Sequence, residues 1–271
     1  MRGGMRRLLS VTAAALVVAA PAAVLTSSAH VVPAAPATSF VLLQMNLCNS
    51  GLARASCYTL GRSVDEAVGN IRRYRPELVT LQEICRSDLY ARDGWGKLAR
   101  AMADLYGSAH VAVDFAPAVN RYTDDSYRCV NGEAFGVAVM HHYAGRDAHH
   151  GRYDSQDDTD EERVWTCTTV IPDRLTGCTT HLSTEPDVAV RQCHELASIL
   201  AAPWVLPEVV VAGDFNLRSG SARGCAPAGY DQSSDDDVQQ VFFTRNVHRV
   251  RGGYEAARWT DHPVLYQWFR V

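Results

Sequence analysis

Lysine is nearly absent from this chain of 271 residues, in which Lys97 is the single example. Almost all of the positive charge is therefore carried by arginine. Acidic residues outnumber basic residues by 30 to 26, which gives a formal net charge of −4. A chain of this charge does not coat nucleic acid through bulk electrostatics, because such binding depends on neutralising many phosphates. A local cationic site remains compatible with the composition.

Long apolar runs are also absent, except near the N-terminus. Leu8–Leu25 is rich in Ala and Val, follows a basic start and precedes two small-residue stretches, Ser27–Ala29 and Ala35–Ala37. This pattern is typical of a secretory signal peptide, which we place at residues 1–37. The alternative is a membrane anchor, since the run is almost long enough to span a bilayer. Residues 1–37 hold three arginines and no acid, so their removal leaves 23 basic and 30 acidic residues.

No Cys-x-x-Cys pair occurs, which argues against a thiolate metal site. The eight cysteines are even in number and follow a signal peptide, so we expect four disulfides, for which about 105 connectivities exist. The segment VWTCTTVIPDRLTGCTTHL is typical of two strands around a turn, with Cys167 and Cys178 at balanced distances from its centre. Sequence order favours three further pairs: Cys48–Cys57, Cys85–Cys129 and Cys193–Cys225.

Internal repeats and low-complexity linkers are not visible in residues 38–271, which fits one α/β domain. Strands in adjacent pairs, together with strands that alternate with helices, predict two packed mixed β-sheets flanked by helices, a four-layer sandwich. Strand-like apolar runs lie at Phe40–Met45, Leu78–Leu81, Ala134–Met140, Val164–Val170, Gly177–Thr180, Val209–Ala212, Val241–Phe243 and Val264–Phe269.

Three segments show apolar residues at helical spacing: Val64–Tyr74, Leu89–Tyr106 and Val188–Leu200. The first is preceded by Ser63, and Glu66 follows three residues later. This spacing predicts a capping box at the helix start.

In the stretch VVVAGDFNLRSG, residues 209–220, an apolar run that predicts a buried strand is followed by a carboxylate and a carboxamide. Side chains at i and i+2 of a strand point the same way, so Asp214 and Asn216 are expected to share one side. Ligands gather at the carboxyl ends of strands in α/β sheets, so polar residues that recur at strand ends predict a single site. The ends of other expected strands carry Asn46, Glu83, His181, Asp261 and His262.

These side chains offer oxygen and imidazole nitrogen but no sulfur. Such a set describes a site for a hard cation with histidines for proton transfer, and Glu83 with Asn46 or Asp261 would be enough protein ligand for Mg²⁺. Taken singly, each residue has a structural explanation, such as an Asx turn for Asp214 or an ion pair for Glu83. Their joint occurrence favours a functional site.

Six short motifs occur in order between Phe40 and the C-terminus: MNLC, YRPELVTLQE, GEAFGVAVM, TTHL, AGDFN and TDHP. As an ordered set they resemble the endonuclease/exonuclease/phosphatase superfamily, which includes deoxyribonuclease I, apurinic endonucleases, neutral sphingomyelinases and inositol polyphosphate phosphatases. The resemblance implies a two-sheet α/β sandwich that hydrolyses phosphoesters with a divalent metal, Mg²⁺ or Mn²⁺.

The resemblance also implies catalytic roles. Asp214 and Asn216 match the pair that orients the attacking water and holds the phosphate. His181 matches a histidine that protonates the leaving oxygen or steadies the phosphate, and Glu133 resembles its carboxylate partner in deoxyribonuclease I. Arg163 matches an arginine aimed at the substrate phosphate.

For the metal, Glu83 matches the principal ligand, with Asn46 beside it and Asp261 near the ion. His262 matches the histidine that acts as general base or phosphate stabiliser. The family usually orients this histidine with an Asp, where the present sequence has Gln239.

A glutamine carbonyl accepts a hydrogen bond from imidazole N–H but stabilises an imidazolium less than a carboxylate does. Asp235, Asp236 and Asp237 are alternatives for the role of the missing Asp.

Two further clusters have structural interpretations. Residues 154–162, DSQDDTDEE, are predicted to form a solvated acidic loop, with structural Ca²⁺ as the alternative. Four histidines that flank a loop are predicted to lie on the surface, with metal binding as the alternative: His141, His142, His149 and His150.

The favoured function is a secreted, extracellular, metal-dependent phosphodiesterase of the deoxyribonuclease I type. Its expected partner is a nucleic acid substrate, and we expect a monomer without stable membrane association. One alternative is a lipid-headgroup phosphodiesterase, which would want an exposed aromatic and apolar hairpin that the sequence does not clearly provide. The other is an inactive binding module of the same fold, which Gln239 would permit.

Overall fold

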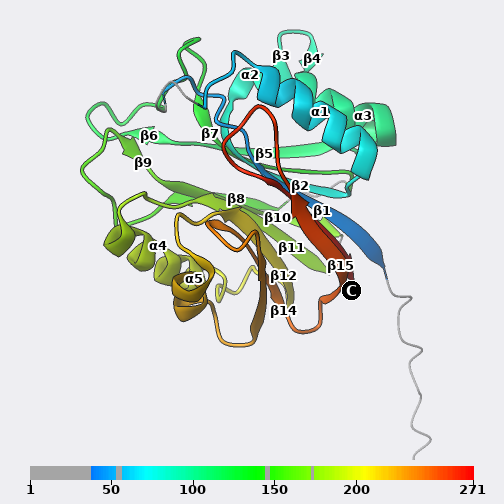
Figure 1. The fold of residues 1–271 in the computed structure, drawn as a ribbon, viewed down its shortest axis with the longest axis vertical. Helices are drawn as coiled ribbons and strands as arrows, with labels where there is room; N and C mark the ends of the chain where they lie inside the picture. The colour runs from blue at the N-terminus through cyan, green and yellow to red at the C-terminus, as the bar shows by residue number, and fades with distance from the viewer. Residues whose placement is uncertain (1–37, 53–56, 144–146, 172–173) are drawn as a thin grey trace, which may run out of the picture. The chain divides into compact units, whose positions relative to one another are not determined.

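The computed structural model describes residues 38–52, 57–143, 147–171 and 174–271. The expected signal peptide at residues 1–37 lies outside these residues. Two six-stranded sheets pack face to face (Figure 1). The order of the first sheet is β15 (His248–Glu255), β16 (Val264–Arg270), β1 (Ser39–Asn46), β2 (Leu78–Cys85), β7 (Phe135–His141) and β5 (Ala112–Pro117). The order of the second is β13 (Tyr230–Ser234), β14 (Gln239–Thr244), β12 (Glu208–Asp214), β11 (Leu175–His181), β10 (Val164–Ile171) and β8 (Ala148–Arg152).

Helices cover the outer face of each sheet (Figure 1). Helices α1 (Arg62–Tyr74), α2 (Arg86–Leu89) and α3 (Lys97–Tyr106) lie on the first sheet, and α4 (Pro186–Ile199) and α5 (Ser219–Cys225) lie on the second. One apolar cluster lies between α1, α3 and the first sheet, a second lies under α4 and α5, and a third fills the space between the sheets. The predicted four-layer α/β sandwich is confirmed.

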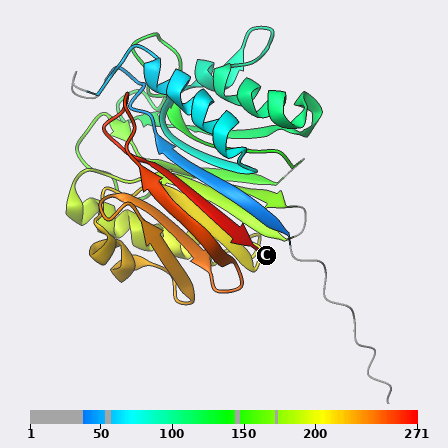
Figure 2. The ribbon, with the colours of Figure 1, turned by 45° about the vertical axis from the view of Figure 1, so that its right-hand side comes forward.

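Each sheet contains one parallel pair of strands, β1 with β2 and β11 with β12. The registers place Asn46 opposite Gln82 and His181 opposite Asp214. The carboxyl ends of the two pairs therefore bring site residues to one edge of the sandwich. Figure 2 shows the C-terminal strand β16 beside the N-terminal strand β1, to which it is antiparallel. This pairing brings the segment that precedes β16 to the same edge.

Four disulfides join the cysteines in the predicted pairs: Cys48–Cys57, Cys85–Cys129, Cys167–Cys178 and Cys193–Cys225. Cys167 and Cys178 lie directly opposite each other in the β10–β11 hairpin, with 4.0 Å between their Cα atoms. The described residues contain no free cysteine, so thiolate metal binding finds no support in them.

Two helix predictions need correction. The expected helix Leu89–Tyr106 is helical only in α3, because α2 ends at Leu89 and the two-residue strands β3 (Tyr90–Ala91) and β4 (Gly94–Trp95) intervene. Gly94 has φ +136, which an L residue in a helix does not adopt.

The predicted capping box is also wrong. Helix α1 begins at Arg62, so Ser63 lies inside its first turn, and no side chain caps the helix start. Glu66 instead accepts hydrogen bonds from the backbone N–H groups of Arg258 and Trp259. The Glu66 carboxylate therefore makes a tertiary contact with the segment before β16 and does not cap α1 as the spacing predicted.

Several elements were not predicted from the sequence. They are β5, β8, β13, β15 and α5, together with the two-stranded pair β6 (Val119–Asn120) and β9 (Glu161–Glu162). The unpredicted strands of the two main sheets lie at sheet edges, where burial is incomplete and the apolar signal is weak. Within the described part of the chain, no helix has both the length and the apolar character needed to cross a bilayer.

Gly213 precedes Asp214 in β12, and a Cβ atom there would meet the backbone oxygen of Thr180 in β11. We expect Gly213→Ala to lower the free energy of unfolding by about 1–3 kcal/mol, because the backbone of β11 would have to move. Gly69→Ala is the control, since Gly69 lies in α1 with open space around it. That variant should gain about 0.5–1 kcal/mol. Urea unfolding measures both, and equal effects would contradict the close approach.

Candidate active site

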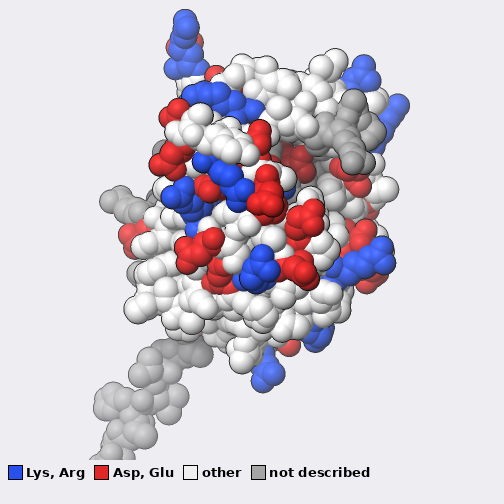
Figure 3. All heavy atoms as spheres, turned by 90° about the vertical axis from the view of Figure 1, so that its left-hand side faces the viewer, with Lys and Arg blue, Asp and Glu red and all other residues white. Residues whose placement is uncertain are grey.

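A pocket of about 480 Å³ opens at the edge where the parallel strands end. Figure 3 shows acidic and basic side chains interspersed on the side of the molecule where β6, β9 and α4 lie. Seven residues predicted to share a site line this pocket: Glu83, Arg163, His181, Asp214, Asn216, Asp261 and His262. Residues separated by as many as 179 positions in the sequence therefore meet as expected.

Asn46 holds two carboxylates together. Its side-chain nitrogen donates hydrogen bonds to Glu83 Oε1 and Asp214 Oδ2, each at 2.9 Å. Its side-chain oxygen accepts from the backbone N–H of Cys48 at 3.0 Å. Asn46 is fully buried, so this amide fixes the positions of Glu83 and Asp214 from beneath the pocket.

Both Glu83 and Asn216 have left-handed backbone conformations, with φ of 53° and 48°. Such values are uncommon outside glycine and are concentrated at functional sites. At Glu83 the cause is visible, because the β2–β7 register shifts between Leu81 and Ile84. Strand β2 therefore continues to Cys85, beyond the predicted end at Leu81, and the irregularity falls at the residue that faces the pocket.

Asp214 and Asn216 form the Asx turn that was considered as a purely structural alternative. The backbone N–H of Asn216 donates to Asp214 Oδ1 at 2.9 Å, and the Asn216 side-chain nitrogen donates to the Leu182 oxygen at 2.8 Å. The turn leaves Asp214 Oδ2 directed toward Asn46 and His262. Asp214 therefore closes a structural turn with one carboxylate oxygen and faces the site with the other.

The site carries an excess of negative charge that a cation would balance. Burial raises the pKa of Glu83 to about 7, the hydrogen bond from Asn46 opposes this, and the carboxylates of Asp214 and Glu161 raise it further. A divalent cation would reverse this effect by favouring the ionised carboxylate. The donor set fits a hard cation, because Glu83, Asp214 and Asp261 all present carboxylate oxygens to the same pocket.

His181 is held by Arg163. The Arg163 Nη1 atom lies 3.0 Å from His181 Nδ1, and a guanidinium only donates hydrogen bonds, so Nδ1 is the acceptor and the ring proton is on Nε2. Nε2 lies 4.0 Å from Glu83 Oε1. Burial and then the charge of Arg163 lower the pKa of His181 well below its ordinary value. The imidazole therefore presents a neutral N–H donor to the pocket.

Glu133 does not occupy the predicted position beside His181, because Arg163 contacts the ring nitrogen that a carboxylate partner would take. Glu133 precedes β7 and is absent from the pocket lining. The carboxylate near Arg163 is Glu161, at 3.1 Å from Nη1. Sequence analysis missed Glu161, although its position two residues before Arg163 places both on one side of an extended chain.

His262 lies among acceptors on one side and an amide on the other. Its Nε2 atom is 3.3 Å from Asp214 Oδ2 and 3.7 Å from Asp261 Oδ1. Gln239 faces its Nδ1 atom at 3.5 Å, at the position predicted for the replaced Asp. The expected contact through the glutamine carbonyl is wrong, because that oxygen accepts from Gln44 Nε2 at 2.7 Å.

Gln239 therefore turns its amide nitrogen toward the imidazole. The described side chain of Asp235 instead accepts hydrogen bonds from the backbone of Asp237 and Gln239, so it shapes the turn and does not replace the missing carboxylate. Beneath the pocket, Gln44 and Gln82 form a buried network with Thr80 and Thr179 between the two sheets.

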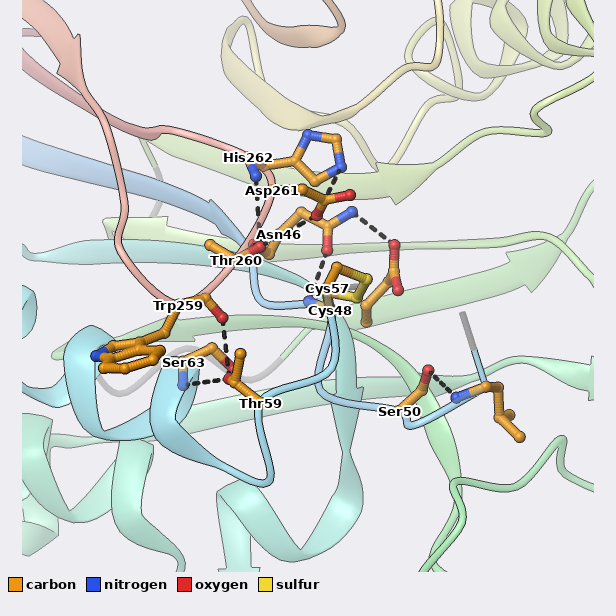
Figure 4. Close-up of a disulfide and its surroundings, with 12 residues drawn as sticks. Asn46, Cys48, Ser50, Cys57, Thr59, Ser63, Trp259, Thr260, Asp261 and His262 are labelled. Carbon is orange, nitrogen blue, oxygen red and sulfur yellow. Dashed lines mark hydrogen bonds and ion pairs between the residues drawn. A yellow bond between two sulfur atoms is a disulfide. The ribbon is translucent and has the colours of Figure 1, made fainter. Parts of the chain in front are cut away.

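The segment before β16 is tied to the N-terminal part of the chain (Figure 4). Thr260 Oγ1 donates to the Asn46 backbone oxygen at 2.9 Å, and Thr59 Oγ1 donates to the Trp259 oxygen at 3.0 Å. The Cys48–Cys57 disulfide lies beside this segment in Figure 4. These contacts fix the position from which Asp261 and His262 enter the pocket.

The prediction of a solvated acidic loop at residues 154–162 needs correction, because part of this stretch is buried. Asp157 is 5% exposed and accepts hydrogen bonds from Ser183 and Thr159, and Glu161 is turned toward Arg163. The remaining acids include exposed ones such as Asp158. The inward turn follows from packing of this segment against the strand that carries His181.

The four histidines do not form one group. His141 is fully buried in β7, which corrects the prediction of a surface position, because β7 lies inside the first sheet between β2 and β5. His142 stacks on Tyr106 with 4.3 Å between ring centres, and His149 stacks on Trp204 at 4.0 Å.

The pocket is also lined by residues that were not predicted to be part of the site: Leu52, Tyr127, Phe135, Thr159, Glu161 and Thr184. Tyr127 and Phe135 form an edge-to-face pair with ring centres 5.9 Å apart. Apolar and aromatic side chains therefore form part of the pocket wall beside the charged groups.

A profile of the Endonuclease/Exonuclease/phosphatase family matches residues 57–269. The chain belongs to this family. Members of the Endonuclease/Exonuclease/phosphatase family hydrolyse phosphoester bonds, and they generally use divalent metals such as Mg²⁺. No curated protein matches the chain by sequence search.

Several solved structures share the fold. An endonuclease/exonuclease/phosphatase from Beutenbergia cavernae is 16% identical, with a TM-score of 0.63 over 86% of this chain and 72% of that one. ANGEL2, a 2′,3′-cyclic phosphatase, is 12% identical, with a TM-score of 0.60 over 87% and 96%. D. rerio TDP2 in complex with a single-strand DNA product is 15% identical, with a TM-score of 0.57 over 86% and 99%.

Proposed function

We propose that this family member is a secreted, divalent-metal-dependent phosphodiesterase of the deoxyribonuclease I type, acting on DNA as a monomer. The observation that carries the proposal is the pairing of Glu83 and Asp214 through one amide nitrogen, with His181 and His262 at the same pocket. In-line attack on a phosphodiester needs an oriented water, charge stabilisation and help for the leaving oxygen, and this set provides a group for each.

Glu83 would hold the metal, with Asp261 near it and Asn46 fixing the Glu83 carboxylate. A bound divalent ion supplies charge stabilisation for the phosphoryl oxygens and the leaving group. Mg²⁺ or Mn²⁺ suits the oxygen donors. A structural Ca²⁺ at residues 154–162 is not part of this proposal, since Asp157 and Glu161 are engaged by neighbouring side chains.

The remaining catalytic roles are assigned to protein side chains. His181 would donate a hydrogen bond from its Nε2–H group to a phosphoryl or leaving oxygen without giving up the proton, a role that needs no imidazolium. Arg163 is buried, and its Nε atom has no hydrogen-bond partner among the described residues. A phosphate oxygen would satisfy that donor, since a buried N–H without an acceptor is costly. Asp214 and His262 would orient the attacking water beside Asn216.

Secretion is supported by the four disulfides, which persist in oxidising compartments. The preference for nucleic acid is supported by the arginine at the pocket. The TDP2 structure with its single-strand DNA product shows that this fold can accommodate such a strand in another protein.

One observation favours a lipid-headgroup phosphodiesterase as a second candidate. Leu52 lines the pocket and is 44% exposed, and Val130, whose backbone N–H donates to the Ser50 oxygen, is 58% exposed. Exposed apolar side chains near a pocket suit contact with a lipid surface. The substrate therefore has to be tested directly.

Purified protein should be incubated with plasmid DNA, choline-headgroup lipid vesicles or a phosphomonoester, each with Mg²⁺ and with EDTA. We expect plasmid nicking with Mg²⁺ and none with EDTA, because the carboxylate cluster needs its cation. Gel electrophoresis measures the nicking. Metal-dependent headgroup release would instead select the lipid enzyme, and inactivity on all three substrates would select a binding module.

A further inference from the structure

Two arginines contact Trp259 in the segment that precedes β16, which also carries Asp261 and His262 and is called the catalytic loop below. The guanidinium carbon of Arg62 lies 4.7 Å from the centre of the Trp259 ring, and that of Arg258 lies 4.8 Å from it. Both arginines are exposed, and Trp259 is half-buried. A guanidinium that packs its face on an aromatic ring keeps its N–H edge free for another partner.

Neither guanidinium forms an ion pair among the residues that the structure describes. The nearby Glu66 is occupied by the backbone N–H groups of Arg258 and Trp259, at 2.9 and 3.0 Å. Carboxylates contact six other arginines: Arg72, Arg73, Arg121, Arg152, Arg163 and Arg218. Further arginines form no ion pair among the described residues either, such as Arg251, which stacks on Trp268 at 4.1 Å far from the pocket lining. The Arg62–Trp259–Arg258 cluster therefore places two guanidinium groups without an ion-pair partner among the described residues beside a single carboxylate, that of Glu66.

The cluster is rigidly connected to the pocket. Trp259 is followed by Thr260, whose hydroxyl donates to the Asn46 backbone oxygen and accepts from the His262 backbone N–H at 3.4 Å. Trp259 is anchored to the start of α1 through Thr59, as Figure 4 shows. Only three positions separate Trp259 from His262 in the chain.

The other side of the pocket carries the opposite charge. A second hollow at the start of α4 shares Thr159 with the pocket wall. It is lined by four acids and one arginine: Asp157, Asp158, Glu185, Asp187 and Arg191. Because α1 and α4 cover different sheets, a polyanion at the pocket is repelled on the α4 side and attracted on the α1 side (Figure 1).

We propose that Arg62, Trp259 and Arg258 form a subsite for a polynucleotide strand that leaves the catalytic pocket toward α1. The two guanidinium groups bind backbone phosphates of this strand, and the exposed part of the indole contacts a base or sugar. The inference rests on the proposed phosphodiesterase function and extends it by naming the residues that hold the strand outside the pocket and the direction in which the strand leaves.

The test compares the double variant Arg62→Gln/Arg258→Gln with Arg245→Gln/Arg270→Gln. The control pair is also exposed and removes the same charge at the far end of β15 and β16. Binding of a fluorescent single-stranded oligonucleotide of about 20 nucleotides is measured by anisotropy in EDTA at several salt concentrations. Unfolding midpoints establish that both variants are folded.

We expect the subsite variant to bind the oligonucleotide about tenfold more weakly than wild type at low salt, with the control within about twofold of it. The slope of log affinity against log salt should fall by about 1 for each lost phosphate contact. A Trp259→Leu variant should weaken binding with an unchanged slope, since the indole carries no charge. Equal losses in the two double variants, or unchanged binding in the subsite variant, would overturn the proposal.

Turnover separates this inference from the proposed function. The loss in kcat/KM should be larger for the oligonucleotide than for bis(p-nitrophenyl) phosphate, whose single phosphate cannot occupy the pocket and bind the cluster at the same time. An equal loss on both substrates would mean that the catalytic loop was disturbed and would count against the subsite. If wild type cleaves neither plasmid DNA nor bis(p-nitrophenyl) phosphate with Mg²⁺, the proposed function itself is wrong.

Discussion

Replacing His181 by alanine is expected to lower kcat for phosphodiester cleavage by about 10²–10³-fold. The ring presents its Nε2 proton to the pocket because Arg163 occupies Nδ1, so the substitution removes a donor at the reacting phosphate. It also leaves Arg163 without this acceptor. Initial rates of plasmid nicking and of bis(p-nitrophenyl) phosphate hydrolysis measure the change.

The matched control is His194→Ala, which removes an exposed imidazole from α4. That variant should keep the rate of wild type. His181→Gln is informative as well, since its amide retains an N–H donor and should recover part of the loss. If His181→Ala keeps more than about a tenth of the wild-type kcat while folded, His181 does not stabilise the reacting phosphate through its Nε2–H group.

Glu83→Gln is expected to reduce activity at limiting Mg²⁺ by about 10²-fold or more, with partial recovery at high Mg²⁺. Glutamine preserves the shape of the side chain and removes the charge that would bind the ion. Activity as a function of Mg²⁺ concentration gives the apparent metal affinity of each variant. Glu133→Gln is the control, because this carboxylate does not line the pocket and should leave the titration unchanged.

The metal titration should also depend on pH. Burial raises the pKa of Glu83 to about 7 in the absence of the ion. Protons therefore compete with Mg²⁺ for the carboxylate as pH falls through 7, and the apparent metal affinity of wild type should fall with it. The apparent metal affinity of Glu83→Gln should not show this dependence on pH. A Glu133→Gln variant that loses affinity as much as Glu83→Gln would refute the assignment of the ligand.

The positions of most site residues could be predicted because they depend on local patterns. An apolar run such as Val209–Ala212 forms a covered strand, and the polar residues directly after it must lie at the sheet edge. Asp214 and Asn216 both line the pocket as predicted, but the two-residue repeat of a strand is not the cause, because β12 ends at Asp214 and Asn216 lies in the turn that follows. The Cys167–Cys178 bridge could be predicted from hairpin symmetry in the same way.

Contacts between neighbouring strands and between the two sheets could not be predicted in this way. Glu133 was matched to His181 by motif position, yet the ring contacts Arg163, because β10 is antiparallel to β11 and brings its start to the end of β11. The orientation of Gln239 depends on Gln44, which lies on the other sheet. The irregularity in β2 that turns Glu83 toward the pocket depends on its register with β7.

The amino-acid sequence by itself determined the sandwich, the Cys167–Cys178 pair and the strand ends at which polar side chains collect, since periodicity and burial act over a few neighbouring residues. Only the tertiary structure decided which nitrogen of each histidine faces the pocket, which carboxylates share one amide, and that Arg62 and Arg258 meet over Trp259. Such contacts join segments as far apart in the chain as Gln44 and Gln239, which are separated by 195 positions, and strand register and packing between layers set their geometry.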